Sequence, residues 1–462
     1  MVFVFLVSRL ARWENAMQYL RRLCRWLFPD RLLDDVQPCD DESPVTRCVS
    51  KLDRDARRQA YVDAIDDIDV LGLASSYNMG KRCEEFGQRT RGSFNLCVFV
   101  VFPDDGSKWV VRFPICPLLH EPWRKLQSEV ATLEFIRAKT TIPVPEVKGH
   151  GQGAGLHPKS RANFPFIILE YISGRPLEYR EILDRPTDDL RPLFAELGEC
   201  LSQLRAHEFQ YGGALVKDGA DGYAIAAPNS VVLNSLQLRG TQRHVERHAT
   251  ALDFALCHYE ALYQSQILPS EETDESEAQL VMFALQDFKL RLCHFIDPKL
   301  NLEPFILSHG DLRPPNIIVN EDLSLAGIID WEWSGTVPLQ FFTPPLWLAG
   351  IDATYPGDAK YRARYPVLHG SLLDASKDAT ASRKLANEWG PDLSSSLRLF
   401  LPSALLRSDL FVSIYYMALF REYYKDSKRD DMLKELYDSC SKFREMVNKM
   451  MEKSDSDMPR LE

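Results

Sequence analysis

The alternation of apolar and polar residues in the first third of the chain predicts a small β-sheet with one helix. Residues 95–102 and residues 108–113 form two apolar, β-branched runs, with Pro-Asp-Asp-Gly between them. Two such runs around an Asp-Gly turn are typical of a β-hairpin. Residues 121–139 carry apolar side chains at helical spacing, and residues 166–171 form a short, mostly apolar strand.

The part of the chain that follows Gly174 is predicted to be mostly helical. Residues 209–226 and 316–330 are the exceptions, because their patterns are typical of hairpins. Ahead of the sheet, residues 53–70 have helical spacing, and the polar, Pro-bearing residues 36–50 are typical of a linker. The chain is therefore expected to contain a small sheet, a short connection and a large helical part.

Three oxygen-bearing side chains flank the second of these hairpins. Asp311 precedes it, Asn316 begins its first strand and Asp330 ends its second strand. Because the two strands of a tight hairpin lie side by side, we expect these side chains to converge. Amide and carboxylate oxygens suit Mg²⁺, which takes its remaining ligands from phosphates and water. The other carboxylate can orient a hydroxyl group and accept its proton.

The same residues carry a resemblance to a known family. The spacing His309-x-Asp311-x4-Asn316, followed by Asp330, resembles the catalytic signature of the protein-kinase-like superfamily. In its form here, with Ile-Ile-Asp-Trp-Glu in place of Asp-Phe-Gly, it is similar to the aminoglycoside phosphotransferase family, which includes many fungal proteins of unassigned substrate. Four positions at this spacing between two apolar strands rarely arise by chance.

The resemblance implies an α+β fold of two lobes, a small β-rich N-lobe and a large helical C-lobe. It implies that ATP binds between the lobes and that Mg²⁺ bridges Asn316, Asp330 and phosphate oxygens. Asp311 would then orient an acceptor hydroxyl for attack on the γ-phosphorus. Arg313 lies where protein kinases place a lysine that steadies the γ-phosphate, and pairing with a nearby carboxylate is an equal alternative. His309 is expected to pack and hydrogen-bond within the loop.

Candidate phosphate-binding residues lie in the predicted sheet and helix. Gly92 and Ser93 precede the first strand, where small residues let backbone N–H groups approach phosphate oxygens, although the full Gly-x-Gly-x-x-Gly is absent. Arg112 occupies the place of the family's usual lysine. Glu129 lies within the apolar stripe of the helix, and a carboxylate that faces a core is costly unless it is paired. We therefore expect an Arg112–Glu129 pair.

The hinge between the lobes is expected at the end of the strand 166–171. There the resemblance implies that backbone groups of Glu170 and Ile172 contact the adenine edge, and an ordinary strand end is the alternative. The expected divisions of the chain are 1–71 as an N-terminal extension of helices and linker, 72–172 as the N-lobe, 173–450 as the C-lobe with the catalytic loop, and 451–462 as a disordered tail.

The composition of the chain limits which classes of partner it can bind and which cellular compartment it favours. Of the 462 residues, 66 are acidic and 55 basic, so the net charge of −11 argues against a nucleic-acid partner. The apolar run of residues 2–7 is too short to span a membrane. The ten cysteines contain no Cys-x-x-Cys, which favours reduced thiols in the cytoplasm. The basic residues 1–28 leave a mitochondrial presequence as the alternative.

Two further patterns are interpreted as structural. His244 and His248 are spaced by four residues, but no third metal ligand is evident in the sequence, so we do not expect a metal there. The aromatic residues of the stretch 411–424 have helical spacing and are expected to pack in the core.

The favoured function is an ATP- and Mg²⁺-dependent kinase that acts on a hydroxylated small molecule, such as an aminoglycoside or choline. A nucleotide-binding pseudokinase or scaffold is the alternative, because Arg112 replaces a lysine and the glycine loop is incomplete. A protein kinase is disfavoured, because Asp330-Trp331-Glu332 replaces Asp-Phe-Gly and no Ala-Pro-Glu segment follows. The sequence leaves the oligomeric state open.

Overall fold

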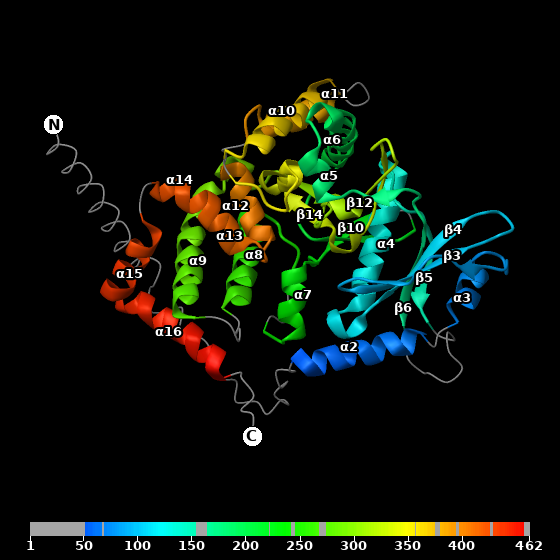
Figure 1. Cartoon of the computed structure of the whole chain (residues 1–462), viewed down its shortest axis with the longest axis horizontal. Coiled ribbons are helices and arrows are strands. Elements are labelled where there is room, and N and C mark those ends of the chain that lie inside the picture. Colours follow the sequence, from blue (N-terminus) through cyan, green and yellow to red (C-terminus); the bar gives the residue numbers. More distant parts are fainter. Residues whose placement is uncertain are drawn as a thin grey trace. The chain divides into compact units, whose positions relative to one another are not determined.

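The computed structural model describes residues 51–66, 69–153, 164–220, 222–241, 245–267, 274–355, 357–374, 379–393, 397–425 and 428–456. The basic segment 1–28 and the linker 36–50 lie outside the described residues, as does His244. The chain divides into two compact units (Figure 1), one made of Met1–Arg47, Gln266–Arg291 and Tyr423–Glu462, the other of Cys48–Ser265 and Leu292–Glu422.

The second unit contains both lobes of the α+β fold, and its N-lobe is an antiparallel sheet of six strands. The strands follow the order β1-β3-β4-β6-β5, and β2 pairs with β3. The predicted hairpin is confirmed, since β3 and β4 pair from Asn95 with Pro114 to Val101 with Lys108. The strand bounds are β1 Glu84–Glu85, β2 Thr90–Arg91, β3 Asn95–Val101, β4 Lys108–Pro114, β5 Val147–Gln152 and β6 Pro165–Glu170.

Helices flank this sheet (Figure 1), and the helix predicted over residues 53–70 is divided in two. The first is α2 (Lys51–Asp66), and the second, α3 (Val70–Tyr77), starts where the Asp69 side chain accepts the Gly72 N–H at 2.8 Å. The cap fixes a new helix start. Side chains of α2 and α3 share one apolar core with the sheet, formed among others by Val62, Ile65, Ala74, Val98, Val111 and Phe166.

The helix predicted over residues 121–139 is confirmed as α4 (Pro122–Lys139). It contacts both β5 and β6. Successive side chains of a strand point to opposite faces of the sheet, so Arg112 lies opposite its neighbours Val111 and Phe113, and it meets α4 through Glu129. Helix α4 therefore packs on the face of the sheet to which the Arg112 side chain points.

The C-lobe of the second unit is mostly helical and holds three small sheets. The two predicted hairpins are confirmed as β9–β10 and β12–β13, but a three-stranded sheet of β8, β11 and β14 was not predicted. Its strands are short and far apart in sequence, so no local pattern reveals them. The strand bounds are β7 Arg175–Pro176, β8 Glu208–Phe209, β9 Ala214–Asp218, β10 Gly222–Ala226, β11 Phe305–Ser308, β12 Ile317–Val319, β13 Leu325–Ile328 and β14 Gly335–Pro338.

The helices of this lobe pack around the sheets, and α6 contacts α10, α11 and β11. The aromatic stretch 411–424 is helical, as predicted, with a π-helical part at Tyr415–Leu419, and Phe411, Tyr415 and Phe420 are buried. The helix bounds are α5 Tyr179–Asp184, α6 Arg191–Arg205, α7 Val231–Leu238, α8 Ala251–Gln266, α10 Ala359–Asp374, α11 Ala379–Trp389, α12 Leu397–Leu406, α13 Phe411–Ile414 and α14 Phe420–Tyr424.

The first unit contains most of α9 (Glu275–Phe295), with α15 (Arg429–Ser439) and α16 (Ser441–Ser456). Within it, Asp287 accepts hydrogen bonds from Arg291 at 3.0 Å and from the Tyr424 hydroxyl at 2.9 Å. The predicted tail starts inside α16, and its last residues, 457–462, lie outside the described part. Among the helices that the structure describes, none combines the length and apolar character that a membrane span requires.

Candidate active site

The candidate catalytic loop, residues 309–316, connects β11 to β12 and is held by backbone geometry that requires glycine. Gly310 has a φ of +80°, and a Cβ atom there would overlap the carbonyl oxygen of Trp333. Only glycine adopts this conformation without strain and allows so close an approach. The loop is thereby fixed against the turn Trp331–Trp333, which follows the hairpin.

His309 positions this loop, as expected. Its Nε2 lies 2.9 Å from the carbonyl oxygen of Ile329, and its Nδ1 accepts the Asp311 N–H at 3.3 Å. The carbonyl can only accept, so the imidazole carries its proton on Nε2. Burial lowers the pKa of His309 to about 4, so the ring is neutral near pH 7. His309 therefore connects the two ends of the site as a fixed neutral group.

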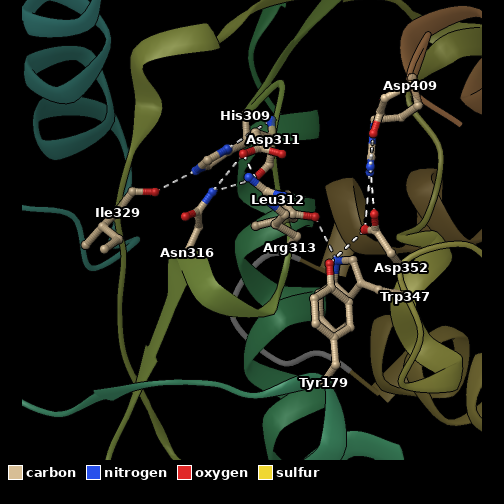
Figure 2. A network of polar contacts seen from close by, with 11 residues as sticks. Tyr179, His309, Asp311, Leu312, Arg313, Asn316, Ile329, Trp347, Asp352 and Asp409 are labelled. Atoms are coloured by element: carbon tan, nitrogen blue, oxygen red, sulfur yellow. Dashed lines mark hydrogen bonds and ion pairs between the residues drawn. The ribbon is translucent and has the colours of Figure 1, made fainter. Parts of the chain in front are cut away.

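Asp311, Arg313 and Asn316 form one hydrogen-bonded cluster (Figure 2). The Asn316 Nδ2 group donates to the Asp311 backbone oxygen at 2.8 Å and to Oδ2 at 3.2 Å. The Arg313 Nε group donates to the same Oδ2 at 3.0 Å. Both side-chain contacts use Oδ2, so Oδ1 stays available for a further ligand. Burial raises the pKa of Asp311, although Arg313, Arg407 and Asn316 oppose this shift.

Asp330 lies beside Asn316 because the hairpin places it there, with the Ile329 N–H donating to the Asn316 carbonyl at 2.9 Å. Its φ of +66° is rare for a residue with a Cβ, and such strain concentrates at functional sites. Burial and the neighbouring Glu332 raise the pKa of Asp330 to about 7.

The oxygen atoms at this edge of the hairpin fit a hard cation. The Asn316 amide nitrogen is occupied by Asp311, and its oxygen points away from that residue (Figure 2). Arg112 contacts only Oδ1 of Asp330, at 3.2 Å. Among the described residues, the Asn316 amide oxygen and the second Asp330 carboxylate oxygen have no hydrogen-bond donor, and such oxygens are the donor chemistry that Mg²⁺ prefers.

Arg112 and Glu129 form the expected ion pair, and Arg112 also contacts Asp330. The side chains of Arg112 and Glu129 are only 7% and 3% exposed, so neither charge has water as an alternative partner. Burial alone would lower the pKa of Arg112, but the surrounding carboxylates, led by Glu129, raise it. One guanidinium therefore connects β4, α4 and the candidate metal ligand.

All ten residues singled out in the sequence line one cavity of about 1260 Å³ in the second unit. Two of their backbone N–H groups are engaged within the protein, since the Gly92 N–H donates to the Asn95 carbonyl at 2.9 Å and the Glu170 N–H donates to the Glu146 carbonyl at 2.8 Å. The lining residues from the prediction are Gly92, Ser93, Arg112, Glu129, Glu170, Ile172, Asp311, Arg313, Asn316 and Asp330.

Comparison with protein families agrees with this geometry. Residues 90–341, which include all ten predicted site residues, match the phosphotransferase enzyme family that is abbreviated APH. The chain belongs to this family. The match begins at β2 and ends just after β14, so it contains β2 to β6 of the N-lobe sheet and the candidate catalytic loop.

Curated relatives of this phosphotransferase-family chain come from fungi. A subtelomeric hrmA-associated cluster protein of Aspergillus fumigatus is 26% identical over 182 residues, which is 39% of this chain and 34% of the relative. The match therefore spans about a third of that relative's length. Clavilactone A biosynthesis cluster protein Y of Ampulloclitocybe clavipes is 22% identical over 324 residues, 65% of this chain and 70% of that protein.

Solved structures similar to this family member include a GDP complex of an aminoglycoside 2'-phosphotransferase IIIa mutant, with 15% identity and a TM-score of 0.41 over 87% of this chain and 100% of that one. An ethanolamine kinase of Plasmodium vivax is 11% identical, with a TM-score of 0.39 over 86% of this chain and 85% of that one.

A polar face of α4 in this phosphotransferase-family chain was not predicted beyond Glu129. Lys125 forms a buried ion pair with Glu332 and lies 4.1 Å from the centre of the Trp333 ring. Thr132 accepts the Ser334 hydroxyl at 3.1 Å. Positions 125, 129 and 132 share a helix face. Their i, i+4, i+7 spacing in the sequence could have revealed this polar face. Through these contacts, one side of α4 packs along the segment that follows Asp330.

A second polar group, called the distal network below, was also missed. It consists of Tyr179, Asp352, Arg407 and Asp409, of which the last three line the cavity. Figure 2 labels Tyr179, Asp352 and Asp409. The Tyr179 hydroxyl donates to Asp352 at 2.7 Å, and Arg407 bonds Asp352 and Asp409, both at 2.8 Å. The positive charge of Arg407 acts on Asp311. Tyr179, Asp352 and the segment Arg407–Asp409 are far apart in the chain and belong to no recognisable motif, so no pattern in the sequence pointed to them.

Proposed function

We propose that this protein transfers the γ-phosphate of ATP to a hydroxyl group of a small molecule, with Mg²⁺ as the required ion. The observation that carries the proposal is the convergence of Asp311, Asn316 and Asp330 on the wall of the cavity that also contains the Arg112–Glu129 pair. Phosphoryl transfer depends mainly on positioning and electrostatics, and these groups supply both.

Asp311 is the proposed catalytic base. Its Oδ2 is held by Arg313 and Asn316, so the free Oδ1 would accept the hydrogen bond of the acceptor hydroxyl and then its proton. Arg313 orients this carboxylate, and the contact favours the second of its two expected roles, pairing with a nearby carboxylate. The Arg313 side chain is still 44% exposed, so its terminal nitrogens remain able to contact a phosphate.

The nucleotide would occupy the N-lobe side of the cavity. Glu129 orients Arg112, whose guanidinium would neutralise phosphate oxygens, and Ser93 lies in the turn that faces them. Ile172 follows β6 at the place where backbone groups would meet the adenine edge. Asn316 and Asp330 would hold Mg²⁺, which when bound neutralises charge on the transferred phosphoryl group.

The size of the cavity supports two ligands. Pockets for a single small molecule usually enclose about 300–1,000 Å³, and this cavity of about 1260 Å³ exceeds that range. The distal network lies on the wall where a second ligand near Asp311 would be contacted. A hydroxylated molecule with polar groups that can bond Asp352 or Arg407 is the proposed acceptor class.

A two-stage experiment tests the proposal. Thermal shift with ATP, with and without Mg²⁺, is expected to show Mg²⁺-dependent stabilisation that Asp330→Ala abolishes and the exposed-site control Asp104→Asn keeps. A phosphate-transfer screen against hydroxylated metabolites then identifies the acceptor. Stabilisation of Asp330→Ala by Mg-ATP equal to wild type would contradict the metal assignment. Mg-ATP binding without transfer to any acceptor class would favour the pseudokinase alternative.

A further inference from the structure

A cluster of side chains of metal-ligating type contains none of the proposed Mg²⁺ ligands, and one of its members, His258, lines the same cavity. His248, Cys257 and His258 each offer a ligand atom, and these atoms all lie within 4.8 Å of one another. His248 is fixed by two backbone hydrogen bonds of 2.8 Å with Gly212, and the other two residues belong to α8. The sequence showed only His244 and His248 as a pair, and the fold supplies the missing partners from the next helix.

His248 has an unsatisfied polar atom. The residue is 4% exposed, and its Nε2 is buried without a hydrogen-bond partner in the described part of the chain. Leaving a buried polar group unpaired costs roughly 1–3 kcal/mol, so such an atom calls for a ligand or an ordered water.

His258 is oriented as a metal-ligating histidine usually is. Its Nδ1 lies 2.9 Å from the Phe254 carbonyl oxygen, which can only accept, so Nδ1 carries the proton and the lone pair is on Nε2. Histidines that bind metals commonly donate their second ring nitrogen to a backbone carbonyl in this way. Phe254 also stacks on the His258 ring, with centroids 4.0 Å apart, and so fixes its plane.

We propose that His248, Cys257 and His258 form a binding site for Zn²⁺, with a fourth position open to water or another ligand. Two imidazoles and one thiolate are the soft-to-borderline donors that zinc prefers, whereas Asn316 and Asp330 offer the hard oxygens that suit Mg²⁺. In a tetrahedral zinc site, bond lengths of about 2.0–2.3 Å separate the donor atoms by roughly 3.3–3.8 Å. The ligand atoms lie within 4.8 Å of one another, so the cluster needs a contraction of no more than about 1.5 Å to reach that geometry.

Binding would join two elements of the C-lobe. The backbone of His248 is tied to Gly212, and the adjacent Gly213 is tied to Thr336 of β14 by hydrogen bonds of 3.2 Å and 2.7 Å. Zinc would therefore connect α8 to the strand that follows the Asp330 turn. The Cys257 thiol proton would be released to solvent as the sulfur–zinc bond forms, so binding is expected to weaken as the pH falls.

The decisive experiment uses full-length protein, a non-thiol reductant, and Zn²⁺ and Co²⁺ as probes. Wild type is expected to retain one zinc ion per chain after dialysis, measured by elemental analysis, and to bind Co²⁺ with the thiolate-to-metal charge-transfer absorption that reports a cobalt–sulfur bond. Cys257→Ser should remove that absorption. Cys257→Ser and His248→Gln should each weaken Zn²⁺ binding by at least about tenfold.

The chain offers a matched control in Cys293 and His294, an adjacent Cys-His pair that is exposed in the same helical lobe. Cys293→Ser and His294→Gln are expected to leave both readouts unchanged, and so is Asp330→Ala, which alters only the Mg²⁺ ligands. Absence of the cobalt–thiolate absorption in wild type would overturn the proposal whatever the variants do. Equal loss of zinc in Cys293→Ser and Cys257→Ser would also overturn it, because the bound metal would then be adventitious.

Discussion

The two polar groups of the cavity differ in how the chain builds them. The candidate catalytic residues Asp311, Asn316 and Asp330 come from one loop and one hairpin, so they lie within twenty residues of sequence. The distal network instead joins Tyr179 on α5 to Asp352 and to Arg407, which are far apart in the chain. The groups proposed for the transfer reaction are thus set by local structure, whereas those proposed for the acceptor depend on the packing of distant segments.

Burial separates the distal network from the Arg112–Glu129 pair, which contacts Asp330 on the catalytic side of the cavity. The side chains of Arg112 and Glu129 are 7% and 3% exposed, whereas those of Arg407 and Asp352 are 25% and 38% exposed. A buried ion pair loses much when one partner is removed, because the other charge stays without solvent. A half-exposed pair is screened by water and can adjust. We therefore expect the Arg112–Glu129 pair to hold a fixed geometry, whereas the side chains of the distal network can adjust to the acceptor that they contact.

The largest expected effect tests the catalytic side. Asp311→Asn keeps the shape of the loop but removes the atom that accepts the proton, so we expect turnover to fall by about 10²-fold or more. Binding of Mg-ATP should change little, because Asp311 is not among the proposed metal ligands. Steady-state transfer kinetics with the acceptor from the screen, together with thermal shift by Mg-ATP, measure the two effects separately.

The matched control for Asp311→Asn is Asp104→Asn in the exposed turn between β3 and β4, which should transfer phosphate at the wild-type rate. Equal rates for Asp311→Asn and wild type would show that the base is elsewhere, and the local origin of the chemistry would then be wrong.

The next effect concerns the buried pair. Glu129→Gln leaves the Arg112 guanidinium buried with Asp330 as its remaining partner, so we expect a loss of about 3 kcal/mol in the free energy of unfolding, the low end for breaking such a pair. ATP affinity should fall as well, because Arg112 loses the carboxylate that orients it. Denaturant unfolding and nucleotide titration measure the two changes.

Glu134→Gln is the control on the same helix, because Glu134 pairs with Lys217 at 2.6 Å where both side chains are more than a third exposed. For Glu134→Gln we expect the free energy of unfolding to fall by less than about 1 kcal/mol, since exposed ion pairs contribute little to stability. A double-mutant cycle of Arg112→Ala with Glu129→Gln should be non-additive by about 0.5–3 kcal/mol. Strict additivity would mean that the two charges do not act together.

The parts of the site that are built from local structure could be predicted from the sequence. The spacing of Asp311, Asn316 and Asp330 predicted their convergence, because a tight hairpin has few possible geometries. The Arg112–Glu129 contact was predictable from a charge placed inside an apolar helical stripe. The strand pair β3–β4 and helix α4 were predictable because their patterns are long and regular.

Other parts of the site depend on contacts that no local pattern encodes. The sheet of β8, β11 and β14 pairs strands of two to four residues across the chain. Lys125 left a detectable signal, since it is one helical turn from Glu129, but its partner Glu332 is 207 residues away. The His248 cluster is similar, because its partners Cys257 and His258 become ligands only once α8 packs beside the segment that carries His248.

The smallest expected effect tests the distal network. Asp352→Asn removes the charge that pairs with Arg407 and weakens the acceptor for the Tyr179 hydroxyl. We expect the KM for the acceptor to rise about tenfold, the equivalent of roughly 1.4 kcal/mol, while the KM for ATP and the turnover number stay near wild type. Asp409→Asn is the matched comparison, because Asp409 bonds the same arginine at 2.8 Å but is 62% exposed, so its effect should be smaller. Initial rates at varied acceptor and saturating ATP give the KM for the acceptor and the turnover number, and rates at varied ATP and saturating acceptor give the KM for ATP. A rise in the KM for ATP instead would place the distal network on the nucleotide side and remove the contrast between the two groups.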